Sequence, residues 1–225
     1  MKSELSNPQT LNDRMAELIR QKIVHGEFTP GQRLSEAALS ESLEISRNTL
    51  REVFRLLTKE GLLKHEPNRG VFVAIPSIAS IIDIYRVRRL IECQALAQAY
   101  PRHPAKKHLR DAVEMALRCR DAGDWQGVGT ANMEFHMAIV ELADSERLNV
   151  MFSHLLAELR LAFGLLNDPE FLHMPYVEMN VNILELFEAG KLQEAAAALN
   201  EYLVHSERIV LAVYARRISD SGTPK

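Results

Sequence analysis

The chain has 225 residues, of which 47% are hydrophobic and 25% are charged, and its formal net charge is −3. This composition is typical of a soluble globular protein with one large domain or two modest ones, and it excludes a generally basic nucleic-acid coat. No apolar run approaches the roughly 18 residues of a membrane span, and the first ten residues lack the order of a signal peptide. Two cysteines form no disulfide framework, so we expect a cytoplasmic protein.

Charge differs only mildly between the two parts of the chain. Residues 1–76 hold 11 Lys and Arg against 10 Asp and Glu, and residues 77–225 hold 16 against 20. Any contact with nucleic acid must therefore come from a local cluster of basic residues.

Three helices are predicted near the N-terminus, after a flexible segment at residues 1–9. The first begins at Thr10, where Asp13 completes a capping-box-like start, and it ends at the glycine- and proline-containing run HGEFTPG. The second spans about residues 35–43. The third follows Ser46, a typical N-cap residue, and ends at Gly61.

Two short β-prone runs follow in LLKHEPNRGVFVAI, on either side of a Pro-Asn-Arg-Gly turn. Three helices and a two-stranded hairpin within about 65 residues form a winged helix-turn-helix pattern. The sequence thus predicts a DNA-binding domain at residues 10–76.

The third helix carries a basic stripe opposite its apolar face, formed by Arg47, Arg51, Arg55 and Lys59. Successive members lie four residues apart and so remain on one side of a helix. The alternative is a solvated charged face, but the preceding helix and the following wing favour DNA binding. We expect the N-terminal end of this helix to meet base edges, with Arg55 and Lys59 contacting the DNA backbone or making no contact.

These residues resemble the DNA-binding domain of GntR-type bacterial transcription regulators. The matching elements are Pro-Gly-x-Arg-Leu, Ser-Arg-x-x-x-Arg-Glu, Glu-Gly-Leu and the Arg-Gly wing. The sequence Asn48-Thr49-Leu50 departs from the commoner Thr-Pro-Val of the family. From the residues and the resemblance together, the predicted DNA contacts are Arg33, Ser46, Arg47, Asn48, Thr49, Arg51, Arg69 and Gly70.

Almost every later segment has helical periodicity. The predicted helices span residues 78–100, 104–122, 124–143, 146–166, 175–189 and 191–217. Short connections between them favour an antiparallel bundle at residues 77–218, followed by a disordered tail at residues 219–225. The predicted fold class is therefore mainly α, a winged helix-turn-helix followed by an all-helical bundle.

This second part is similar to the FCD domain of FadR-type GntR regulators, through IIDIYRVRRLIE, FHMAIVELADSERL and LFEAGKLQEAAAALNEYL. The resemblance implies a homodimer and a helical bundle that binds a small organic effector, often a carboxylate. A dimer also follows independently, because one recognition helix reads only a short half-site.

Many FCD domains hold a divalent metal with one Asp and three His. By alignment of motifs, these four positions carry Asn132, His136, Asn180 and Tyr202 here, so three of the four family ligands are substituted. Two amides, a phenol and one imidazole form a poor donor set for a transition metal, and no metal cofactor is predicted. His154, His173 and His205 are conceivable replacements, and Glu134 points to a different helix face.

The sequence instead predicts a neutral hydrogen-bonding cup for an effector, formed by Asn132, His136, Asn180 and Tyr202. Arg88, at the family's arginine position, could pair with an anionic group of the ligand. The alternative is that these polar groups satisfy one another within the core.

The predicted function is a ligand-responsive transcription regulator, usually a repressor, that binds a palindromic operator as a homodimer. One alternative is a DNA-binding regulator with a filled pocket and no effector. Another is a metal-assisted enzyme using His136, although no catalytic motif supports it.

Overall fold

The structure is a computed structural model that describes residues 10–100, 102–165 and 169–221. The predicted flexible segment at residues 1–9 lies outside this range. The N-terminal part contains, in chain order, α1 (Leu11–Val24), β1 (Arg33–Leu34), α2 (Glu36–Ser42), α3 (Arg47–Lys59), β2 (Leu63–Glu66) and β3 (Gly70–Val73). This order confirms the winged helix-turn-helix arrangement predicted from the sequence.

The helix starts follow from local hydrogen bonding. At α1, the hydroxyl of Thr10 accepts from the backbone N–H of Asp13, whose side chain accepts from the backbone of Thr10, so the predicted capping box is present. At α3, the hydroxyl of Ser46 accepts from the backbone N–H of Thr49 at 3.0 Å. Both contacts satisfy backbone donors that the first turn of a helix leaves unpaired.

The wing has one more strand than the sequence predicted. β3 pairs antiparallel with β2 and, on its other edge, with β1, giving the order β1-β3-β2. The added strand is only Arg33 and Leu34, which pair with Phe72 and Val71. Two residues are too few to show the alternation by which a strand is recognised in a sequence.

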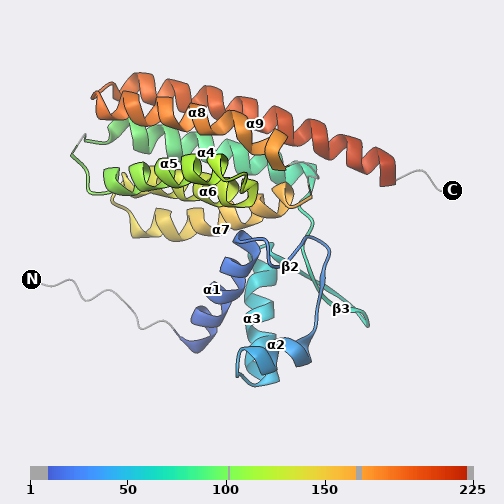
Figure 1. The fold of residues 1–225 in the computed structure, drawn as a ribbon. Helices are drawn as coiled ribbons and strands as arrows, with labels where there is room; N and C mark the ends of the chain where they lie inside the picture. The colour runs from blue at the N-terminus through green and yellow to red at the C-terminus, as the bar shows by residue number, and fades with distance from the viewer. Residues whose placement is uncertain (1–9, 101, 166–168, 222–225) are drawn as a thin grey trace, which may run out of the picture.

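The C-terminal part is an all-helical bundle, as predicted. It consists of α4 (Ile78–Gln98), α5 (Lys106–Asp121), α6 (Trp125–Glu141), α7 (Glu146–Phe163), α8 (Pro169–Glu188) and α9 (Leu192–Ser221). Figure 1 shows these helices stacked side by side above the N-terminal part, with α7 as the layer nearest to it. In the described part of the chain, no helix is both long and apolar enough to span a membrane.

Two helix boundaries differ from the sequence prediction by four residues or more. α8 begins at Pro169 instead of residue 175, and Pro175 lies inside it. An internal proline removes one backbone hydrogen bond, so a helix begins at a proline more often than it continues through one. α9 extends to Ser221, past residue 218 and into the predicted tail, whereas residues 222–225 lie outside the described residues.

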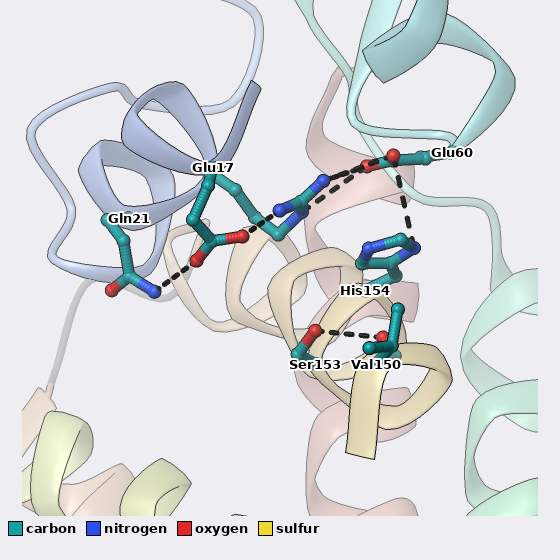
Figure 2. Close-up of polar contacts among 7 residues, drawn as sticks. Glu17, Gln21, Glu60, Val150, Ser153 and His154 are labelled. Atoms are coloured by element: carbon teal, nitrogen blue, oxygen red, sulfur yellow. Dashed lines mark hydrogen bonds and ion pairs between the residues drawn. The ribbon is translucent and has the colours of Figure 1, made fainter. Parts of the chain in front are cut away.

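One helix of the bundle belongs to both hydrophobic cores. Phe152 and Leu159 of α7 pack in the bundle core, whereas Ala157 and Leu161 on its other side complete the core of the N-terminal part. Polar contacts flank this junction. Arg20 of α1 donates to Glu60 at 2.9 Å, and the imidazole of His154 on α7 lies 3.9 Å from the same carboxylate, an arrangement shown in part in Figure 2. The two parts are therefore packed together through α7.

Candidate nucleic-acid interface and effector site

Helix α3 separates a buried face from an exposed one. Its apolar residues recur at helical spacing and so form one stripe, and the buried residues of that stripe are Leu50, Val53, Phe54 and Leu57. On the opposite face Arg47 and Asn48 are exposed at the N-terminal end. Figure 1 shows α2, the adjoining start of α3 and the turn of the β2–β3 hairpin on the side away from the bundle. The exposed start of α3 is thus free to enter a groove of DNA.

The other predicted contacts on α3 are partly held in place by neighbours. The hydroxyls of Ser46 and Thr49 lie 2.8 Å apart, and Nε of Arg51 donates to Glu36 of α2 at 3.0 Å. Arg55, for which base contact was not expected, pairs with Glu52 on its own helix. Arg47 forms no ion pair within the described residues, which leaves its guanidinium available for a base or a phosphate.

The wing carries two of the predicted DNA contacts, Arg33 and Arg69. Arg69 pairs with Glu66 and lies 5.5 Å from the centre of the Phe72 ring, which fixes it at the hairpin. Gly70 has a φ of 105°, a conformation that disfavours any side chain, and a Cβ there would lie 3.4 Å from Nε of Arg33. Arg33 of β1 therefore packs against the glycine of the wing, next to the turn that carries Arg69.

In the bundle, the structure brings together three of the four cup residues through direct hydrogen bonds. Oδ1 of Asn132 accepts from Nδ2 of Asn180 at 2.7 Å and from the hydroxyl of Tyr202 at 3.0 Å. They come from α6, α8 and α9, and each is at most 5% exposed. The helical spacing of Asn132 and His136 places both inside the bundle, as the sequence predicted.

His136 contacts a carboxylate that the sequence reasoning missed. Nδ1 of His136 lies 2.5 Å from Oε2 of Glu92, and Nε of Arg88 donates to the other oxygen of Glu92 at 2.7 Å. The predicted neutral cup is therefore incomplete, because a buried ion pair forms one wall of it. The available signal was the spacing of Arg88 and Glu92, which lie four residues apart and hence on one face of α4.

Burial and charge set the protonation of this group. Burial lowers the pKa of His136, so its imidazole is neutral near pH 7. Burial alone would raise the pKa of Glu92, but Arg88 and His136 together outweigh it, and that pKa is lowered. Glu92 is then a carboxylate that accepts from Nδ1–H of His136, which leaves Nε2 as a hydrogen-bond acceptor.

Three buried polar atoms of the cup have no partner among the described residues. They are Nη2 of Arg88, Nε2 of His136 and Oδ1 of Asn180. Unpaired buried polar atoms are costly, so natural proteins satisfy nearly all of them. A cationic donor and two acceptors are thus available to a polar molecule at this position.

The donor set does not fit the divalent metal that many FCD domains hold. Oδ1 of Asn132 already accepts two hydrogen bonds, and His136 is the single imidazole at the four family positions. Among the described residues, no three His, Cys, Asp or Glu side chains lie close enough together to hold a metal ion.

The conceivable replacement residues lie elsewhere. Glu134 is exposed on α6, His154 lies beside Glu60, and His205 is exposed on α9 near Tyr176. His173 is buried, 3% exposed, but it lies against Phe163 and not in the cup. None of these side chains joins His136.

An exposed recognition helix beside a wing, joined to an all-helical domain with a buried polar cluster, defines a DNA-binding transcription regulator. Residues 11–73 match the bacterial regulatory proteins of the gntR family, and residues 83–205 match the FCD domain. The chain belongs to the gntR family, in the branch with an FCD domain. These families consist of transcription regulators, so the prediction that the chain is a regulator and not an enzyme is confirmed.

Individual proteins agree with this assignment. A crystal structure of a GntR transcriptional regulator from Rhodococcus sp. RHA1 is 35% identical, with a TM-score of 0.85 over 90% of this chain and 98% of that one. The repressor RspR of Escherichia coli is 32% identical over 44% of this chain and 43% of its own length. The regulator YdhC of Bacillus subtilis is 27% identical over 60% of this chain and 62% of its own length. The matched segments thus span less than two thirds of these two curated relatives.

Proposed function

We propose that the chain acts as a homodimer that binds a palindromic operator. A small organic effector, bound in the helical bundle, weakens or strengthens this binding. The basic, exposed start of α3 and the wing support specific DNA contact, with Arg47 and Asn48 reading bases and Arg33, Arg69 and Ser46 holding phosphates. Such a regulator works on chromosomal DNA in the cytoplasm. The similarity to RspR, which is named as a repressor, favours repression here.

The unpaired polar atoms around the cup support the proposed binding of an effector. Nη2 of Arg88 is a buried cationic donor, and Nε2 of His136 and Oδ1 of Asn180 are buried acceptors. A molecule with a carboxylate and a nearby hydroxyl or amine would satisfy both kinds of atom at once. We therefore assign Arg88, Asn132, His136, Asn180 and Tyr202 to the effector site, and we add Glu92 as the residue that orients Arg88 and His136.

A second candidate is a regulator whose cup is filled by its own side chains. The observation in its favour is that Asn132, Asn180 and Tyr202 already bond to one another. The two candidates share the DNA-binding function and differ only in whether a ligand enters the bundle.

The test begins by selecting operator sequences from random DNA with the full-length protein. Fluorescence anisotropy then measures binding to the selected duplex and to a scrambled one, at several salt concentrations. Equal, purely salt-dependent binding to both duplexes would exclude an operator-specific regulator.

The effector is tested by thermal shift with a library of hydroxy and amino carboxylic acids. A ligand that raises Tm in the wild type, changes operator affinity, and has no effect on Arg88→Met supports the effector site. If no acid stabilises the protein, the filled cup is favoured. Tyr202→Phe is the milder variant, because it removes one hydroxyl and keeps the ring in the core.

A further inference from the structure

A second cavity lies at the junction of the two parts, away from the cup. Its volume is about 210 Å³, and it is bounded by the segment after α1, by the C-terminal end of α7 and by the start of α8. Phe28 and Leu172 supply apolar walls, Thr29 lies at an exposed edge, and Arg160 and His173 supply the polar groups. It shares no residue with the cup in the bundle.

Arg160 is a buried cation for which the described residues supply no carboxylate partner. It is 8% exposed, and its Nε donates to the backbone carbonyl of Val24, in the last turn of α1, at 2.8 Å. Within residues 10–100, 102–165 and 169–221 it forms no ion pair. Burial lowers the pKa of Arg160, but a guanidinium stays charged at any physiological pH. Desolvation of a charge without a counter-ion costs several kcal/mol, and none of the described residues supplies one, so this position favours an anion.

His173 is a second buried group that lacks a partner. It is 3% exposed, and its Nδ1 has no hydrogen-bond partner among the described residues. Its ring and the guanidinium of Arg160 converge on Gly129 of α6. A Cβ at that glycine would lie 2.5 Å from Nη1 of Arg160 and 2.7 Å from Nε2 of His173. The absence of a side chain at Gly129 is therefore what lets the two polar groups meet beside the cavity.

We propose that this junction cavity binds a small organic carboxylate, with its carboxylate on Arg160 and His173 and its apolar body against Phe28 and Leu172. Arginine can grip a carboxylate with two parallel hydrogen bonds, and the described lining of the cavity supplies no competing carboxylate. The apolar walls favour an organic acid over an inorganic anion, because they gain by being removed from water.

Such a ligand would act on the position of the DNA-binding helices. Arg160 already binds the last turn of α1 through Val24, so a second partner on the same guanidinium changes a contact between the two parts. By linkage, the carboxylate would alter operator affinity and the operator would alter affinity for the carboxylate by the same factor.

Benzoate is a suitable probe, with neutral benzamide and inorganic phosphate as controls. Titration calorimetry on the full chain would compare the wild type with Arg160→Met, which removes the charge, and with Thr29→Trp, which blocks the cavity from an exposed position. Thr29→Ser is the matched control for the second variant. His136→Gln alters only the cup and separates this site from the proposed effector site.

The expected result is saturable binding of benzoate, weakened about tenfold or more by Arg160→Met and Thr29→Trp and unchanged by Thr29→Ser and His136→Gln. Benzamide should not bind, and benzoate should shift the imidazole resonances of His173 in NMR spectra. The proposal is overturned if benzoate does not bind, or if Thr29→Trp binds it like the wild type. Loss of binding in His136→Gln alone would place the acid in the bundle, and tighter binding of phosphate would exclude an organic carboxylate.

Discussion

His136 and Glu92 meet in the centre of the bundle, with Nδ1 of the histidine 2.5 Å from Oε2 of the glutamate and neither side chain exposed. Because Arg88 binds the other oxygen of the same carboxylate, Glu92 holds two residues of the proposed effector site at once. The geometry of the proposed effector site therefore depends on Glu92. Glu92 has no unpaired polar atom of its own with which to bind a ligand.

Replacing Glu92 with glutamine should destabilise the protein strongly. The change leaves the guanidinium of Arg88 buried without a counter-charge, and breaking a buried pair in this way costs about 3 kcal/mol or more. Guanidinium denaturation at neutral pH measures the loss. Asp111→Asn is the matched control, since Asp111 and Lys107 form an exposed pair with the same spacing on α5 and should contribute little. Equal midpoints for the two variants would show that the buried pair adds nothing.

Stability should fall with acid partly through His173. Burial, assisted by the nearby charge of Arg160, lowers its pKa to about 3 in the folded protein, whereas an unfolded histidine titrates near 6.5. Below about pH 6.5 the unfolded state therefore binds a proton that the folded state does not, and stability decreases by up to about 1.4 kcal/mol per pH unit. The loss continues until the pH reaches the folded pKa.

His173→Gln removes this contribution, so its loss of unfolding free energy between about pH 6 and pH 5 should be smaller by about 1 kcal/mol. Denaturation curves at the two pH values measure the difference. His136 and Glu92 titrate equally in both proteins and cancel in the comparison. His65→Gln, an exposed substitution on β2, is the control for the loss of a histidine. Parallel slopes for His173→Gln and the wild type would contradict a neutral buried imidazole.

Arg47→Ala should weaken binding to the selected operator by about 1 to 3 kcal/mol and leave binding to scrambled DNA less affected. The reason is that Arg47 is exposed at the start of α3 and carries no ion pair in the described structure, so its guanidinium is free to grip a base edge. Anisotropy titrations measure both affinities. Arg118→Ala, an exposed substitution on α5, serves as the control. A uniform loss on both DNAs would assign Arg47 to the phosphate backbone.

Arg69→Ala should act differently, with a similar loss on every DNA sequence. Arg69 lies in the wing beside Phe72, where we expect it to contact phosphates or the minor groove. Loss of one phosphate contact should reduce the slope of log affinity against log salt by about 1. Titrations at several salt concentrations give this slope. A sequence-dependent loss with an unchanged slope would mean that the wing reads bases.

The sequence predicted those features that depend on neighbouring residues. Thr10 and Asp13 form their capping box within one helical turn, and Ser46 caps α3 through Thr49, so short-range residue types were sufficient. The inward position of Asn132 and His136 followed from helical spacing and apolar neighbours. Each of these predictions required only the periodicity of a single helix.

Features that join distant segments were missed. Glu92 lies 44 residues from His136, and no local pattern links an acidic residue on one helix to an imidazole on another. Arg160 donates to a carbonyl 136 residues away, and Gly129 appears in the sequence as an ordinary helix-weakening glycine. β1 was not predicted because its two residues form a strand only through pairing with β3. Tertiary packing decided all of these.

The position of α7 in both hydrophobic cores has a consequence for cooperativity. Ala157 and Leu161 complete the N-terminal core, while Phe152 and Leu159 on the same helix complete the bundle core. Unfolding of one part would expose apolar surface of α7, the helix that also completes the core of the other part. The free energies of unfolding of the N-terminal part and of the bundle are therefore not independent. Heat or denaturant should then unfold the chain in one concerted step, and a fragment ending near residue 76 would lose part of its own core.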